Sequence, residues 1–323
     1  MTHYWEGRAP YRIGAGEGGD QESSDEENIA LDLVRPLCPE LAALDVVVGY
    51  NDTFYSPGPE PLPRLESVTL AYDNTEDGFD LAGLRHLASA APNIQSVVGF
   101  QVSGCDERCD LGNVTHLRLG ASAMSLTDLR FALLSCPRLK SLEYSAAGSV
   151  VGFEQFTPFE MEDALVEHLP RLKSLVLDLD ESPSDGMVVD EGWVMRSLGG
   201  LRELRRLEVD TRCLVPHRNP HSTTDVRLPD GQFLPFDPGM IAAEAGLEAL
   251  VGLLPESICE LRIWRDGYGP EVAKLGPAVV GLAMAERFAC LRRVCLEGRG
   301  AEQVVSIGPA FEARGIEFVI RGE

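Results

Sequence analysis

The sequence predicts an α/β solenoid in which strand, loop and helix alternate along the chain. Three observations predict it. A short phrase with apolar residues at positions one, four and six recurs, most clearly at 65–70, 139–144 and 172–177. The segments between the phrases carry apolar residues at helical spacing. Proline precedes several phrases, where it ends a helix and favours an extended segment. Since stacked units contact only their neighbours, such a chain has no fixed size limit.

The phrase matches the strand signature of a leucine-rich repeat, in which a unit takes roughly 20–29 residues. The anchors at its first position are Leu41, Leu65, Ile94, Val114, Leu139, Leu172, Leu204, Ile258 and Leu291. Side chains alternate along a strand, so positions three and five face away from the core. We therefore expect an irregular leucine-rich-repeat horseshoe with a parallel inner sheet and outer helices.

Helices are expected between the phrases. Ser125 is a good N-cap residue, and Leu126, Leu129, Leu133 and Leu134 follow at helical spacing. The acidic start of Glu160–Leu169 suits the positive end of a helix. Similar patterns predict helices over Asp80–Ala90, Glu191–Leu198, Ala278–Phe288 and Ala301–Ala313.

The chain divides into a tail and a repeat domain. Residues 1–28 are Gly-rich and acidic, a composition that predicts disorder. The repeat domain is expected over 29–323, with its last strand at 315–320 acting as a cap. The longest interval between anchors contains a polar, Pro-rich stretch, and we interpret 213–239 as an insertion. Within it, Asp225–Leu234 predicts a hairpin around a Pro-Asp-Gly turn. A missed degenerate repeat is the alternative.

Composition narrows the function classes. The formal net charge is -23, with 51 acidic and 28 basic residues, so the surface repels nucleic acid and favours basic partners. No signal peptide and no apolar stretch long enough to cross a membrane is visible. Four of the eight cysteines, Cys136, Cys259, Cys290 and Cys295, lie in repeat units among apolar neighbours, as in a reducing compartment, while the even count leaves a disulfide framework as the alternative. These features predict a cytoplasmic or nuclear protein that does not associate with membranes.

Several short motifs are candidate chemical sites. The glycines at 14–19 spell a dinucleotide fingerprint, but a poor strand precedes them and an acidic run follows. Cys213, His217 and His221 have zinc-ligand chemistry without an evident fourth ligand. Cys105 and Cys109 suit a loop disulfide, a metal pair or two unbridged thiols. Ser23 and Ser24, ahead of an acidic run, suit phosphorylation. Because no serine elbow or Walker loop appears, we assign no catalytic residue, no cofactor and no metal site.

The concave face of the predicted horseshoe is the remaining candidate site, because solenoids commonly bind partners there. In the first half, its positions three and five are Ser67, Thr69, Ser96, Val98, His116, Arg118, Ser141, Glu143, Ser174 and Val176. The second half adds Cys295 and the charged residues Arg206, Glu208, Glu260, Arg262 and Arg293. We expect a protein partner to engage these charged residues, although the same side chains could simply solvate a sheet.

The phrase Pro-Arg-Leu-Lys-Ser-Leu, at 137–142 and again at 170–175, follows an apolar helical segment each time. This arrangement resembles the repeat region of fungal F-box proteins, over about residues 30–323. The resemblance implies substrate recognition for a ubiquitin ligase, with the ligase adaptor held by an F-box module upstream of the repeats. The acidic start of this chain does not match an F-box. A free-standing repeat protein that binds other proteins is therefore the alternative, and an enzyme is the least favoured class.

Overall fold

The computed structural model describes residues 40–48, 61–72, 78–146, 156–179, 188–189, 194–215, 217–218, 226–227, 233–234, 246–264 and 272–322. The chain forms two compact units, Met1–Glu154 and Gln155–Glu323, called unit 1 and unit 2 below. Both are α/β. The expected tail at 1–28, with its glycine fingerprint and its two serines, lies outside the described residues.

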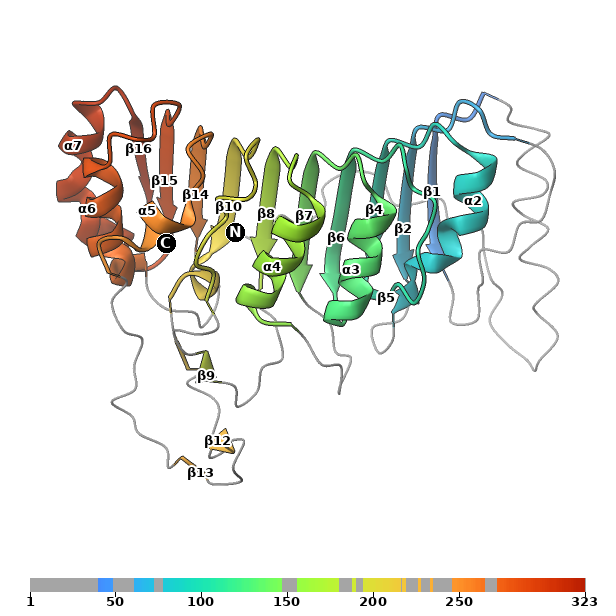
Figure 1. The fold of residues 1–323 in the computed structure, drawn as a ribbon, viewed down its shortest axis with the longest axis horizontal. Helices are drawn as coiled ribbons and strands as arrows, with labels where there is room; N and C mark the ends of the chain where they lie inside the picture. The colour runs from blue at the N-terminus through green and yellow to red at the C-terminus, as the bar shows by residue number, and fades with distance from the viewer. Residues whose placement is uncertain are drawn as a thin grey trace. The chain divides into compact units, whose positions relative to one another are not determined.

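Unit 1 is built on a parallel sheet. Its strands, in spatial order, are β1 (Ala43–Val48), β2 (Ser67–Tyr72), β4 (Ser96–Phe100), β6 (His116–Ser122) and β7 (Ser141–Ala146). The helical segments are η1 (Leu81–Gly83), α2 (Leu84–Ala90) and α3 (Leu126–Ser135). Two short strands, β3 (Phe79–Asp80) and β5 (Val102–Gly104), pair with each other. The two α-helices lie along one side of the strands (Figure 1).

Unit 2 repeats the same plan. Its main strands, in spatial order, are β8 (Ser174–Asp178), β10 (Arg206–Asp210), β14 (Glu260–Trp264), β15 (Arg293–Glu297) and β16 (Glu317–Arg321), all parallel. Its helical segments are α4 (Pro158–His168), η2 (Thr211–Cys213), α5 (Ala249–Leu253), η3 (Val272–Leu275), α6 (Gly276–Met284), η4 (Ala301–Ile307) and α7 (Gly308–Glu312). Three of them, α4, α6 and α7, lie beside the strands on one side (Figure 1).

The recurring phrase sets the register of the parallel strands in each unit. Each main strand from β1 to β15 begins two residues after its predicted anchor, as Ser67 follows Leu65. The first residues of the strands pair across each unit, so equivalent positions form straight rows. All the anchors from Leu65 to Leu291 are buried, while Leu41 is only half-buried. The predicted strands, their register and these core positions are therefore confirmed.

The last strand, β16, departs from the phrase in the expected way. At the first position of its unit stands Gly315, with φ of 70°, instead of an apolar anchor. Glycine adopts this left-handed conformation without the steric cost that a Cβ brings. The strand side chains Phe318 and Ile320 are only half-buried, because no further strand unit of the described chain covers them.

Helix α3 begins where the sequence predicts, after Ser125, whereas α4 begins at Pro158, two residues before the predicted Glu160. Ser125 and Thr157 each accept a hydrogen bond from the third residue of the following helix, which bonds back through its carboxylate. These capping boxes satisfy backbone donors that a helix start otherwise leaves unpaired. Two expectations were wrong. Leu134 is exposed rather than on the core side of α3, and the described residues 194–198 are not helical.

The insertion predicted at 213–239 lies between β10 and β14, and most of its residues lie outside the described ones. Strand β10 pairs directly with β14, so among the described residues no missed repeat strand lies between them. The predicted hairpin is present as β12 (Val226–Arg227) and β13 (Phe233–Leu234), which are antiparallel. The predicted first residue of the insertion, Cys213, was wrong, because Cys213 and Val215 are fully buried core residues. Beyond Val215, strand β11 (His217–Arg218) pairs with β9 (Val188–Val189).

Candidate partner-binding face

The candidate site is the sheet face of unit 2 that carries positions three, five and seven of the strands, here called the open face. Position seven is included because β10, β14, β15 and β16 each extend one residue further than the predicted phrase. Register places Arg206, Glu260, Arg293 and Glu317 in one row, Glu208, Arg262, Cys295 and Val319 in the next, and Asp210, Trp264, Glu297 and Arg321 in the third. Charged side chains from different strands are therefore direct neighbours.

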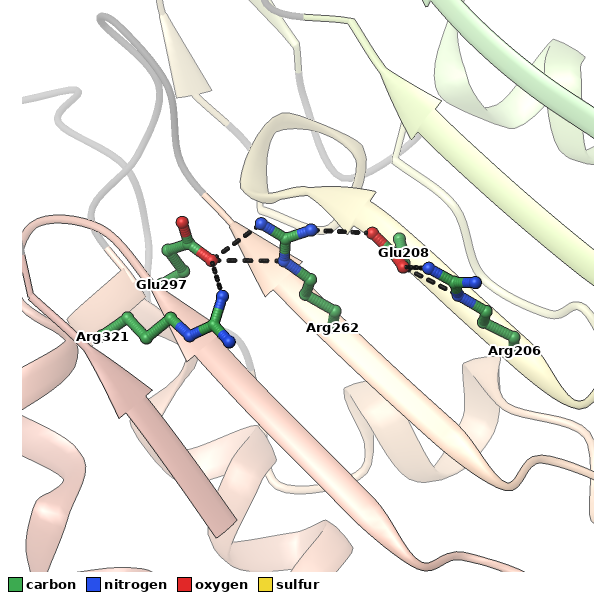
Figure 2. A network of polar contacts seen from close by, with 5 residues as sticks. All are labelled: Arg206, Glu208, Arg262, Glu297 and Arg321. Carbon is green, nitrogen blue, oxygen red and sulfur yellow. Dashed lines mark hydrogen bonds and ion pairs between the residues drawn. The ribbon is translucent and has the colours of Figure 1, made fainter. Parts of the chain in front are cut away.

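Five of these residues form a chain of alternating charges, the ion-pair ladder, made of Arg206, Glu208, Arg262, Glu297 and Arg321 (Figure 2). Arg262 is at its centre. Its Nη1 donates to Glu208 Oε2 at 3.0 Å, and its Nε and Nη2 donate to Glu297 Oε2 at 3.2 and 2.8 Å. At one end the Nε of Arg206 donates to Glu208 Oε1 at 2.8 Å. At the other, Arg321 Nη1 lies 3.6 Å from Glu297 Oε2.

The ladder buries its carboxylates and exposes its end arginines. The side chains of Glu208 and Glu297 are 10% and 19% exposed, against 54% and 52% for Arg206 and Arg321. Burial by itself lowers the pKa of Arg262, but the hydrogen bonds and charges of Glu297 and Glu208 outweigh burial and raise it above its usual value. Arg262 is therefore a permanent cation that holds both carboxylates in place.

An aromatic ring lies beside the ladder. The guanidinium carbon of Arg262 is 5.5 Å from the centre of the Trp264 ring, within the range of a cation–π contact. Trp264 is half-buried, so part of its ring faces solvent. A flat aromatic surface next to fixed charges is typical of the residues that anchor protein interfaces.

A shallow depression of ≈ 160 Å³ lies in the same face. Four arginines and two glutamates contribute to its lining, and the remaining residues are Leu207, Leu261 and Cys295. The charged residues of the lining are Arg206, Glu208, Glu260, Arg262, Arg293 and Arg321. The chain as a whole has a net charge of -23, so a depression with more cations than anions is a local exception.

All the sequence-predicted site residues lie on this face, but not all as expected. Arg206, Glu208 and Arg262 belong to the ladder, while Arg293 pairs with Glu317 at 3.6 Å. Glu260 is exposed and lies between Arg206 and Arg293 in its row. The expectation that Glu208 is exposed was wrong, because it is covered by the guanidinium groups on both sides. Cys295 is buried for a similar reason, and desolvation raises the pKa of its thiol.

Sequence analysis missed Trp264, Glu297 and Arg321. All three occupy position seven, which is two residues after position five and faces the same side of the sheet, whereas the phrase assigns only positions three and five to this side. The signal that could have found them is the side-chain period of two, continued from Arg262 to Trp264 and from Cys295 to Glu297.

The open face of unit 1 differs in chemistry. On this face, within the described residues, Arg118 Nε pairs with Glu143 Oε1 at 3.0 Å, and the guanidinium carbon of Arg118 lies 5.6 Å from the centre of the Phe100 ring. Most other positions there are serine, threonine or valine, as the sequence indicates. This pair is a useful reference because it has the same groups as the ladder but is isolated and half-exposed.

The structure gives little support to the cysteine and histidine motifs as chemical sites. Cys105 and Cys109 are free, buried thiols, and the hydrogen bond that Cys105 donates to Cys109, together with burial, raises the pKa of Cys105. Cys213 is buried, while the side chains of His217 and His221 lie outside the described residues. Within the described ranges, no three His, Cys, Asp or Glu side chains are grouped as a metal site requires.

In comparisons with known proteins, no family model matches this chain, and a search of the curated proteins finds no match. In the part of the chain that the structure describes, none of the helices combines the length and the apolar composition needed to cross a bilayer.

Proposed function

We propose that this chain is a leucine-rich-repeat protein that binds another protein on the open face of unit 2. The observation that carries the proposal is the ion-pair ladder across β10, β14, β15 and β16. An exposed ion pair contributes only about 0–1 kcal/mol, and in a buried pair desolvation can cancel the attraction, although removing one partner is costly. Holding an arginine in one conformation also costs up to about 2 kcal/mol of rotamer entropy. Fold stability is therefore a weak reason for such an array.

Recognition is a better reason. Guanidinium groups that are already oriented lose less entropy when a partner binds, so affinity improves without additional contact area. The ladder provides them at both ends, with Trp264 as an aromatic contact between. Charges in a fixed pattern also select the partner and its orientation. The parallel rows and the helices on one side support the repeat type, and solenoids commonly bind on the face without helices.

The finer hypothesis is that the partner is a substrate of a ubiquitin ligase, as the resemblance to F-box proteins implies. It places the chain in the cytoplasm or nucleus, and the unbridged cysteines of the described residues are compatible with that. The alternative is a free-standing interaction protein without a ligase. Affinity purification followed by mass spectrometry separates the two hypotheses. Co-purification of a ligase adaptor and a cullin supports the first, and their absence beside a reproducible partner supports the second.

The binding face itself is tested with the purified partner. Arg206→Ala combined with Arg262→Ala should weaken binding at least about tenfold, or about 1.4 kcal/mol. The matched control combines Ser67→Ala with Ser96→Ala, which removes two side chains from the open face of unit 1 and should change affinity little. Equal effects of the two pairs, measured by titration calorimetry on variants with intact circular dichroism, would refute the proposed face.

A further inference from the structure

The depression in the open face of unit 2 has an excess of unsatisfied cationic donors. Arg293 and Arg321 each make one ion pair at 3.6 Å, which is beyond hydrogen-bonding distance. Within the described residues, their N–H groups therefore lack a protein acceptor. Their side chains are 42% and 52% exposed, so these donors face solvent. Arg206 likewise donates through Nε and Nη2 and keeps Nη1 unused among the described contacts.

The carboxylates of the lining are less available. Glu208 accepts hydrogen bonds from Arg206 through Oε1 and from Arg262 through Oε2, and it is almost fully buried. Of the two glutamates of the lining, only Glu260 is exposed. A group that enters the depression therefore meets mainly N–H donors with positive charge. A guanidinium matches a carboxylate well, because two parallel N–H groups can bind its two oxygens.

The overall acidity of the chain argues for basic partners, but distance limits this effect. At physiological ionic strength the Debye length is about 8 Å, so charges farther away are largely screened. Groups within and beside the depression consequently decide what binds there. The neighbouring carboxylates Glu297 and Glu317 already pair with arginines, so the donors left unused among the described residues are those of Arg206, Arg293 and Arg321. The acidic surface elsewhere slows the approach of an anionic partner without removing this local preference.

We propose that the depression binds a carboxylate side chain of an acidic segment of the partner protein, with Arg293 and Arg321 as its main donors. The inference rests on the proposed function and specifies its partner. The volume of ≈ 160 Å³ suits this group, since one water molecule takes about 30 Å³ of liquid and a carboxylate with a few bound waters fills the space. Neighbouring residues of the segment then lie over β14 and β16, where the Trp264 ring is partly open.

The test uses the full chain and defined probes. The probes are short fluorescein-labelled peptides of Ser, Gly and Tyr that carry Glu, Gln or Lys at the same interspersed positions. Fluorescence anisotropy should give at least about tenfold tighter binding for the Glu peptide than for the Gln peptide, a difference of about 1.4 kcal/mol. Arg293→Gln combined with Arg321→Gln should abolish this difference. Both substitutions keep hydrogen-bonding side chains, and Glu297 retains its bonds from Arg262.

Arg118→Gln is the matched control, because it removes an arginine of similar exposure from the open face of unit 1. It should leave the affinity of the Glu peptide unchanged. Equal affinity for the Glu and Gln peptides, tighter binding of the Lys peptide, or a Glu preference that survives the double substitution would each overturn the inference. In these cases the purified partner decides whether the proposed function survives. If Arg206→Ala combined with Arg262→Ala still weakens its binding, only the proposal of an acidic segment fails. If the double substitution leaves its binding unchanged, the proposed function fails as well.

Discussion

Replacing Arg262 with methionine tests the role of the ladder in stability. Methionine has a similar length, so the change removes the central charge and its three hydrogen bonds to Glu208 and Glu297 with little loss of volume. Exposed ion pairs contribute about 0.2–1 kcal/mol, and breaking a buried pair costs about 3–5 kcal/mol. Arg262 is 32% exposed and its partners are 10% and 19% exposed, so the cost should lie between these limits, at about 2 kcal/mol.

The measurement is urea denaturation followed by circular dichroism. Arg118→Met, which breaks the isolated and half-exposed pair of unit 1, is the control and should cost less than about 1 kcal/mol. Arg262→Met combined with Glu297→Gln should recover part of the loss, because the substitution removes one of the uncompensated carboxylates. A cost for Arg262→Met no larger than that of the control would show that the ladder is not a buried network, and the reasoning would be refuted.

Two further predictions concern unit 2 and its fold. Leu172→Ala should lower the free energy of unfolding by about 2–5 kcal/mol, because Leu172 is fully buried. Leu134→Ala, on the exposed side of α3, should lower it by less than about 1 kcal/mol. Similar losses for the two variants in denaturant melts would contradict the register. Glu162 of α4 is buried and accepts hydrogen bonds from the backbone N–H groups of Arg196 and Ser197, yet desolvation raises its pKa. A raised pKa in the folded state means that stability from this group is complete below the unfolded pKa of about 4.3 and is lost as pH rises through the folded value. The stability of Glu162→Gln relative to the natural chain should therefore improve as pH rises from about 4 to 7, and a pH-independent difference would contradict this assignment.

The strands could be predicted from the sequence because the phrase specifies them locally. Apolar residues at positions one, four and six define the buried face, and the strand period of two then places every other side chain. The anchors Leu65 and Leu172 are fully buried for this reason. The capping boxes of α3 and α4 are also local, because each joins two residues that are three apart in sequence, Ser125 with Asp128 and Thr157 with Glu160.

The site could be predicted only in part, because its geometry depends on contacts between strands. Local alternation correctly places Glu208 and Cys295 on the open face, but it cannot show that Arg262 of the neighbouring strand bonds to Glu208 or that both residues are buried. Residues 194–198 show the same limit: their spacing suits a helix, whereas they form neither helix nor strand, and the buried Glu162 of α4 accepts from the backbone N–H groups of Arg196 and Ser197. Tertiary hydrogen bonds here override the local pattern.

The central claim is that the open face of unit 2 is a protein-binding surface. Hydrogen–deuterium exchange of the full chain, measured by mass spectrometry with and without the purified partner, tests it most directly. The account predicts slower exchange in peptides that contain β10, β14, β15 and β16, with little change in β2 and β4 of unit 1 or in the helices α4 and α6. Protection confined to those helices or to unit 1, with unchanged exchange in the four strands of the ladder, would contradict it.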